Sequence, residues 1–104
     1  MRKIKIKNKK IIPLLEEAVA LLKITKSVKK IALFGSQARG DNRENSDIDL
    51  AVWGKIKTYD CETLKERLKT LPTLRTVDLV HYEYARDYMK ESINQEKIIL
   101  YERR

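Results

Sequence analysis

The chain contains few of the residues that stabilise small secreted or zinc-binding domains. It holds one cysteine and one histidine among its 104 residues, which excludes an internal disulfide and argues against a zinc site. No apolar run approaches the roughly 20 residues that a membrane-spanning helix needs. Three glycines and two prolines leave no low-complexity tract or long linker. We therefore expect one soluble globular domain with no contact to a membrane.

An export signal is also missing. Residues 11–24 are largely apolar and follow a basic start, but Pro13, Glu16 and Glu17 interrupt the apolar stretch, and no small-residue cleavage site follows it. A cytoplasmic location is therefore expected.

Acidic residues are scarce only at the start of the chain. Residues 1–30 hold ten lysines and arginines against two glutamates, whereas the other 74 residues hold 13 charges of each sign and account for none of the net charge of +8. We expect a basic N-terminal arm at residues 1–10, either an edge strand or disordered, before a single domain at residues 11–104. Such an arm attracts polyanions, including nucleic acid, and also aids solubility.

Hydrophobic periodicity predicts alternating helices and strands. The predicted fold class is α/β (α+β), a small mixed β-sheet with helices packed on one face. Cys61 follows the apolar stripe of one helix, which predicts core packing, and Thr58 or Asp60 is expected to cap that helix. Helices are predicted at residues 12–24, in a short turn after Gly35, from residue 58 or 60 to 71, and at 85–92, and strands at 30–34, 47–53, 77–80 and 98–101.

Three aspartates occupy predicted strands. Asp47 and Asp49 are two residues apart, so their side chains project from one face of the strand while Ile48 projects from the other. At about 6 Å and an effective dielectric near 20, two carboxylates repel by roughly 3 kcal/mol, and a divalent cation would reverse that cost. Asp78 repeats the pattern in the next strand. The three carboxylates suit Mg²⁺ or Mn²⁺, although the pair alone is equally typical of a strand beginning beside a loop.

A strand that breaks at a glycine and a serine precedes these acids. Gly35 would let a phosphate approach the backbone, and Ser36 is expected to cap a short helix whose free N–H groups and hydroxyl offer donors to phosphate oxygens. An ordinary strand-to-helix turn would show the same residues. The short connection to Asp47 predicts an antiparallel second strand, which would bring that acid beside the turn.

These residues together resemble a known family. Gly35-Ser36, ten intervening residues and Asp47-Ile48-Asp49 resemble the G-S-x10-D-x-D signature of the DNA polymerase beta-like nucleotidyltransferase superfamily. The string GSQARGDNRENSDIDLAV, followed by VDLV, is similar to the minimal nucleotidyltransferases (MNT) of bacteria and archaea. The resemblance covers about residues 12–101 and implies the nucleotidyltransferase fold of that superfamily.

The resemblance also implies roles for individual residues. It implies that Asp47 and Asp49 ligate two Mg²⁺ ions, for which Mn²⁺ can substitute, and that Asp78 ligates the catalytic one. Gly35 and Ser36 would bind the triphosphate. Such an enzyme is a transferase in which one metal activates the acceptor hydroxyl and the other neutralises the leaving pyrophosphate. Arg39 is a candidate to reach the phosphates, with a surface role as the alternative.

The acceptor follows from the resemblance and from the chain length. Only 26 residues follow Asp78, so we expect a partner chain to recognise the acceptor or to be the acceptor. Minimal members are often antitoxins paired with helical HEPN-type toxins and adenylylate a toxin tyrosine. ATP is therefore the expected donor, although no residue identifies the base, and an oligomer is compatible with the sequence.

Two alternatives remain open. One is a non-catalytic antitoxin or subunit that masks its partner through exposed aromatic residues, for which the candidates are Trp53, Tyr82, Tyr84 and Tyr88. The other is a nucleic-acid-binding module that uses the basic arm, with an affinity that depends on salt.

Overall fold

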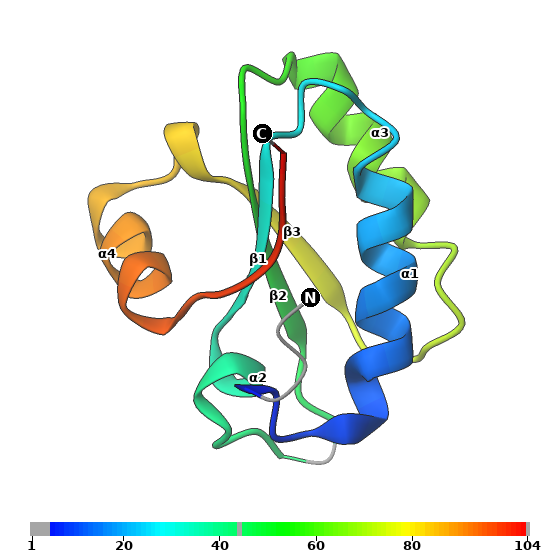
Figure 1. The fold of residues 1–104 in the computed structure, drawn as a ribbon, viewed down its shortest axis with the longest axis vertical. Coiled ribbons are helices and arrows are strands. Elements are labelled where there is room, and N and C mark those ends of the chain that lie inside the picture. Colours follow the sequence, from blue (N-terminus) through cyan, green and yellow to red (C-terminus); the bar gives the residue numbers. More distant parts are fainter. Residues whose placement is uncertain (1–4, 44, 104) are drawn as a thin grey trace.

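A four-stranded mixed sheet carries helices on both of its faces in a computed structural model of the chain (Figure 1). The structure describes residues 5–43 and 45–103. In chain order the elements are η2 (Lys9–Ile11), α1 (Ile12–Leu22), β1 (Lys30–Phe34), α2 (Ser36–Arg39), β2 (Ile48–Trp53), α3 (Thr58–Leu68), β3 (Val77–His81), η3 (Tyr82–Tyr84), α4 (Asp87–Glu96) and β4 (Ile98–Glu102).

The strand order is β3-β2-β1-β4. β1 pairs antiparallel with both β2 and β4, whereas β2 and β3 are parallel. The parallel pair needs a crossover, and α3 provides it. These observations confirm the predicted fold class and the predicted antiparallel direction of the second strand.

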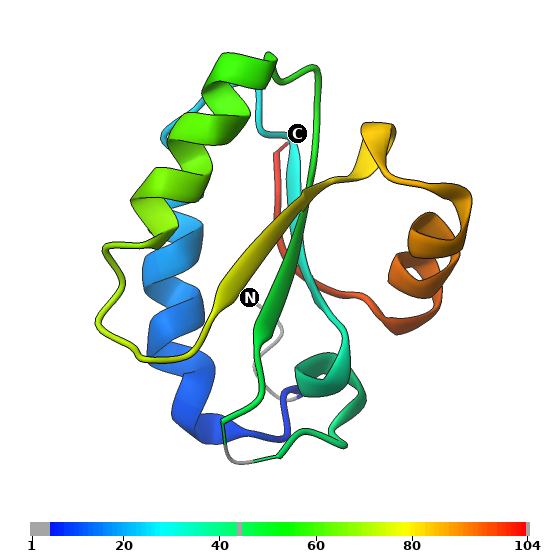
Figure 2. The ribbon, with the colours of Figure 1, turned by 180° about the vertical axis from the view of Figure 1, so that it is seen from behind.

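Helices cover the two sheet faces unequally. α1 and α3 lie on one face, and α4 lies on the opposite face (Figures 1 and 2). The prediction that helices pack on one face is correct for α1 and α3 and wrong for α4. Ile93 of α4 joins a small apolar cluster with Phe34 of β1 and Ala51 of β2, and Met89 packs against it. Burial of these side chains holds α4 against β1 and β2.

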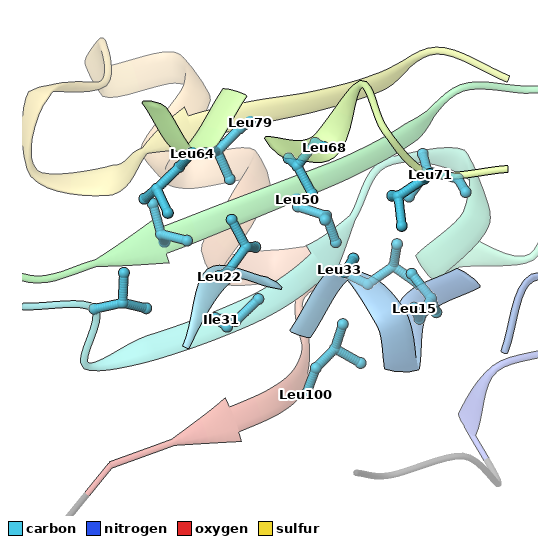
Figure 3. Packing of buried hydrophobic residues seen from close by; sticks show 14 of the residues in the cluster. Leu15, Leu22, Ile31, Leu33, Leu50, Leu64, Leu68, Leu71, Leu79 and Leu100 are labelled. Carbon is cyan, nitrogen blue, oxygen red and sulfur yellow. The ribbon is translucent and has the colours of Figure 1, made fainter. Parts of the chain in front are cut away.

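The main core lies between the sheet and the α1–α3 layer. Leu33 and Leu50 come from the central strands and are fully buried, as are Leu15 of α1 and Leu64 of α3 (Figure 3). Burying one such side chain contributes about 1.5–3 kcal/mol. This core stabilises the sheet, whose strand ends carry the candidate site residues.

Some helix boundaries differ from the predictions. The N-cap of α3 is Lys57, without a side-chain cap, so the prediction of Thr58 or Asp60 as the cap is wrong. Asp60 instead lies in the first turn, where the helix dipole favours a carboxylate. Cys61 is buried as predicted. α4 continues to Glu96, one turn beyond the predicted end.

The described part of the basic arm packs against the domain. Ile6 is fully buried in the main core, and the Asn8 side chain donates a hydrogen bond of 3.2 Å to Gln37. Residues 1–4, the rest of the predicted arm, lie outside the described residues. Every helix within residues 5–43 and 45–103 is too short or too polar to cross a membrane.

Candidate active site

The three predicted aspartates lie on the sheet face that carries α4. Asp49 of β2 and Asp78 of β3 are direct partners in the parallel register, at a strand spacing of about 4.8 Å. Asp47 lies just before β2, which begins at Ile48 and not at the predicted residue 47, and its side chain lines the same groove as Asp49. Ile48, which alternates with them, is buried in the core on the opposite face. Asp49 is half-buried, whereas Asp47 and Asp78 are exposed.

The carboxylates affect one another electrostatically. The pKa of Asp49 is raised above its usual value, first by burial and then by the negative charges of Asp78 and Asp47, while Arg39 acts in the opposite direction. Both causes disfavour the ionised form of Asp49. A bound cation would relieve the repulsion and restore the charge.

The donor set fits a hard divalent cation in its chemistry. Three carboxylates and no imidazole or thiolate form the oxygen-only set that Mg²⁺ and Mn²⁺ prefer. Among the described residues, no three His, Cys, Asp or Glu side chains lie close enough together to hold a metal ion in their present positions. Asp47, Asp49 and Asp78 would therefore have to draw together around a cation.

The turn after β1 has a backbone that only glycine adopts readily. Gly35 has φ +77° and ψ −160°, a region that costs other residues about 1–3 kcal/mol. A Cβ on Gly35 would overlap Asp49 Oδ2 and lie 3.2 Å from its Cγ. The space that was expected to admit a phosphate is therefore occupied by the Asp49 carboxylate. Glycine brings the turn and the acid into contact.

The donors of this turn differ from those expected. Gly35 is the N-cap and Ser36 the first residue of α2, so the prediction of Ser36 as the cap is wrong. The Gly35 amide donates to Glu96 Oε1 at 3.0 Å and is not free. The Ser36 amide and hydroxyl make no hydrogen bond to another described residue, which leaves both groups available to a ligand.

Arg39 is the last residue of α2 and forms two ion pairs. Its Nη1 donates to Glu96 Oε2 at 2.7 Å and its Nε to Asp41 Oδ2 at 3.0 Å. The hydrogen bonds to Asp41 and Glu96 raise the pKa of Arg39, and the same contact with Arg39 lowers the pKa of Asp41. The Arg39 side chain remains 45% exposed, so it can still meet a phosphate.

A groove of about 540 Å³ lies between this turn and α4. Its α4 wall includes Tyr88, Ser92 and Glu96, which share one helix face because they are four residues apart. The residues that line the groove are Phe34, Gly35, Ser36, Arg39, Asn45, Ser46, Asp47, Asp49, Tyr88, Met89, Ser92 and Glu96. Five of the six predicted site residues are therefore in one groove. The sixth, Asp78, lines a separate groove of about 450 Å³ at the sheet edge and joins the others only through its pairing with Asp49.

Sequence reasoning missed two residues that shape this site. Glu96 gave no signal because the helix was expected to end before it. Gln37 is fully buried; it accepts from Asn8 and donates to the Ser46 carbonyl at 3.2 Å. It thus ties the loop that precedes Asp47 to the first helical turn. A glutamine inside the Gly-Ser turn was the only available clue.

Comparisons with known proteins identify the family of this chain. The profile of the family described as "Polymerase beta, Nucleotidyltransferase" matches residues 16–104. A relative from Methanocaldococcus jannaschii, provisionally named a protein adenylyltransferase, is 39% identical over 83 residues, which is 75% of this chain and 82% of the relative.

Solved structures show the same fold. One chain of a toxin-antitoxin crystal structure with AMP-PNP superposes with a TM-score of 0.72 at 26% identity, over 84% of this chain and 72% of that chain. A provisionally assigned minimal nucleotidyltransferase superposes with a TM-score of 0.63 at 30% identity, over 83% of this chain and 91% of that chain. The chain therefore belongs to the polymerase beta-like nucleotidyltransferase family and is a member of the minimal, MNT type.

Proposed function

We propose that this nucleotidyltransferase moves AMP from ATP to a hydroxyl group of a partner protein, in a reaction that depends on Mg²⁺. The partner we propose is a HEPN-type toxin with a tyrosine as the acceptor, which makes this chain the antitoxin of the pair. The observation that carries the proposal is the pairing of Asp49 with Asp78 beside the Gly35 turn. The two carboxylates lie in register beside hydrogen-bond donors that are free to bind phosphate oxygens. This arrangement suits phosphoryl chemistry better than a structural role, because the paired carboxylates destabilise the empty site.

The chain's own residues divide the work of the reaction. The Ser36 amide and hydroxyl would hold the phosphates, and Arg39 would supply positive charge beside them. Asp47, Asp49 and Asp78 are the residues that would hold the metal. When bound there, Mg²⁺ neutralises phosphate charge and makes the acceptor hydroxyl more acidic.

The transfer itself balances with one bond formed and one broken. The acceptor oxygen bonds to the α-phosphorus, the bond between that phosphorus and the oxygen bridging to the β-phosphate breaks, and pyrophosphate leaves. The acceptor hydroxyl loses its proton to water. Water can reach this part of the site because Asp78 is exposed. Holding the two reactants in line and stabilising the developing charge supply most of the acceleration.

The relatives support the donor and the partner. A relative is provisionally named a protein adenylyltransferase, and a similar chain comes from a toxin-antitoxin structure with AMP-PNP. The groove is open along α4, where Tyr88 is 64% exposed, and a partner's side chain can enter from that side. Adenine is the base we propose on the strength of these relatives.

The proposal is tested by transfer of label from α-labelled ATP, with Mg²⁺, to a co-purified or genomically adjacent partner. The test variant carries Asp47→Asn and Asp49→Asn. A matched control carries Glu62→Gln and Glu66→Gln, which neutralise two exposed acids of α3 that form only surface ion pairs.

We expect the wild type and the control to label the partner and the aspartate variant not to. Equal labelling by the aspartate variant would refute the role of the carboxylates. A stable complex without label, tried with all four nucleotides, would favour a binding antitoxin instead.

A further inference from the structure

Glu96, the last residue of α4, connects that helix to the Gly35–Arg39 turn after β1. Its Oε1 accepts from the Gly35 amide at 3.0 Å and its Oε2 from Arg39 Nη1 at 2.7 Å. The Glu96 side chain is 18% exposed, so both contacts are partly shielded from water. One carboxylate thus holds both ends of α2, its N-cap and its final residue.

This carboxylate does not stabilise its own helix. A negative charge in the last turn opposes the helix dipole, and the Gly35 and Arg39 groups that donate to Glu96 lie 61 and 57 residues earlier in the chain. The favourable interactions of Glu96 therefore belong to the turn. Its position is explained by support of the turn and not by stabilisation of α4.

The turn needs such a support. Gly35 is buried, has a backbone conformation that few residues adopt, and lies so close to Asp49 that a Cβ would overlap its carboxylate. Its amide would be an unpaired buried donor without Glu96, which is costly. Glu96 keeps the turn in this conformation, which leaves the Ser36 donors in the groove and keeps Arg39 at its rim.

We propose that Glu96 is a positioning residue, which fixes the Gly35–Arg39 turn for phosphate binding by bridging the Gly35 amide and the Arg39 guanidinium. This inference rests on the proposed function, since it assigns the turn to the phosphates of the nucleotide. Glu96 itself contacts protein groups and acts on the nucleotide through the turn.

Two substitutions separate the two contacts. Glu96→Gln keeps an amide oxygen for the Gly35 amide but loses the charge that holds Arg39, whereas Glu96→Ala loses both. We expect Glu96→Ala, which loses both hydrogen bonds, to weaken AMP-PNP binding by about tenfold. Glu96→Gln, which loses only the charged contact with Arg39, should weaken it by about threefold. Glu91→Gln is the matched control, because Glu91 is exposed on the same helix and does not line the groove.

A second readout needs no nucleotide. Amide hydrogen exchange at Gly35 should accelerate by about tenfold in Glu96→Ala and stay close to the wild-type rate in Glu96→Gln. The chain provides a matched internal control, since the Gly54 amide donates to Glu83 Oε2 at 3.0 Å. Glu96→Ala should leave exchange at Gly54 unchanged, and Glu83→Ala should accelerate it while leaving Gly35 unchanged.

The outcomes separate this inference from the proposed function. Unchanged exchange at Gly35 in Glu96→Ala would overturn the inference, as would AMP-PNP binding equal to or tighter than that of the wild type. Tighter binding would show that the carboxylate competes with the phosphates. If the wild type failed to bind AMP-PNP at all, the proposed function would fall and the phosphate-binding part of the inference with it, whereas the exchange data would still decide whether Glu96 holds the turn.

Discussion

Replacing Gly35 by alanine should destabilise the protein more than the same change at Gly40, although both glycines have positive φ. Gly35 has φ +77° and ψ −160°, whereas Gly40 has φ +86° and ψ +13°. The first conformation is nearly restricted to glycine and costs about 1–3 kcal/mol. The second is the ordinary left-handed region, where alanine costs about 1–2 kcal/mol.

The surroundings increase the difference. A Cβ at Gly35 would overlap the Asp49 carboxylate, which sits on a central strand, whereas a Cβ at Gly40 would overlap Cδ of the flexible Lys7 side chain. Forcing Asp49 from its rotamer adds about 0.5–1.5 kcal/mol, but Lys7 can move away cheaply. We therefore expect Gly35→Ala to lower the free energy of unfolding by about 2–4 kcal/mol and Gly40→Ala by about 1–2 kcal/mol.

Urea unfolding followed by the fluorescence of Trp53, the single tryptophan, measures both values. In an Asp49→Ala background the Gly35→Ala cost should fall by the rotamer part, because the overlapping oxygen is gone. A cost for Gly35→Ala no larger than that for Gly40→Ala would refute this account of the turn. An unchanged cost in the Asp49→Ala background would refute the contact between the glycine and the acid.

Three further predictions concern the sheet face below the groove. Asp49→Asn should raise the free energy of unfolding in metal-free buffer by about 0.5–1 kcal/mol, because it removes a like-charge neighbour, and should abolish stabilisation by added Mg²⁺; an unchanged Mg²⁺ response in thermal melts would contradict this. Because the folded-state pKa of Asp49 is raised above the usual value of 3.8, its ionisation destabilises the fold at neutral pH, and that penalty should disappear as the pH falls through the raised pKa. The Asp49→Asn variant, measured without metal, should lack this component, and identical pH profiles of variant and wild type would argue against it. Ile93→Ala should cost about 2–5 kcal/mol because Ile93 of α4 is fully buried against the sheet, and a loss below about 1 kcal/mol in urea unfolding would show that α4 is not anchored there.

The strands were predictable because their patterns are simple. Residues 30–34 form a continuous apolar run that ends at a glycine, and β1 has those bounds. Strict alternation placed Asp47 and Asp49 on one face, and that prediction needs only the period of a strand. The same alternation predicted Asp78 on that face, and the resemblance to a known family implied its role as a metal ligand.

The remaining features depend on contacts between distant parts of the chain. No glycine or proline marks the end of α4, so its last turn and Glu96 fall beyond the predicted helix, and the two partners of Glu96 lie 57 and 61 residues away in the sequence. The contact between Gly35 and Asp49 requires the register of β1 and β2, which turn length alone does not fix. Ile6 alternates with lysines, and only the assembled core shows that it is buried.

The central claim, transfer of a nucleotide and not of a phosphate, is tested most directly by two parallel reactions of the protein with its partner and Mg²⁺. One reaction contains ATP labelled at the α-phosphate and the other ATP labelled at the γ-phosphate. The account predicts that the partner retains label from the α-phosphate only, because pyrophosphate carries the γ-phosphate away. Retention of the γ-label, or of neither label by a partner that binds the protein, would contradict it.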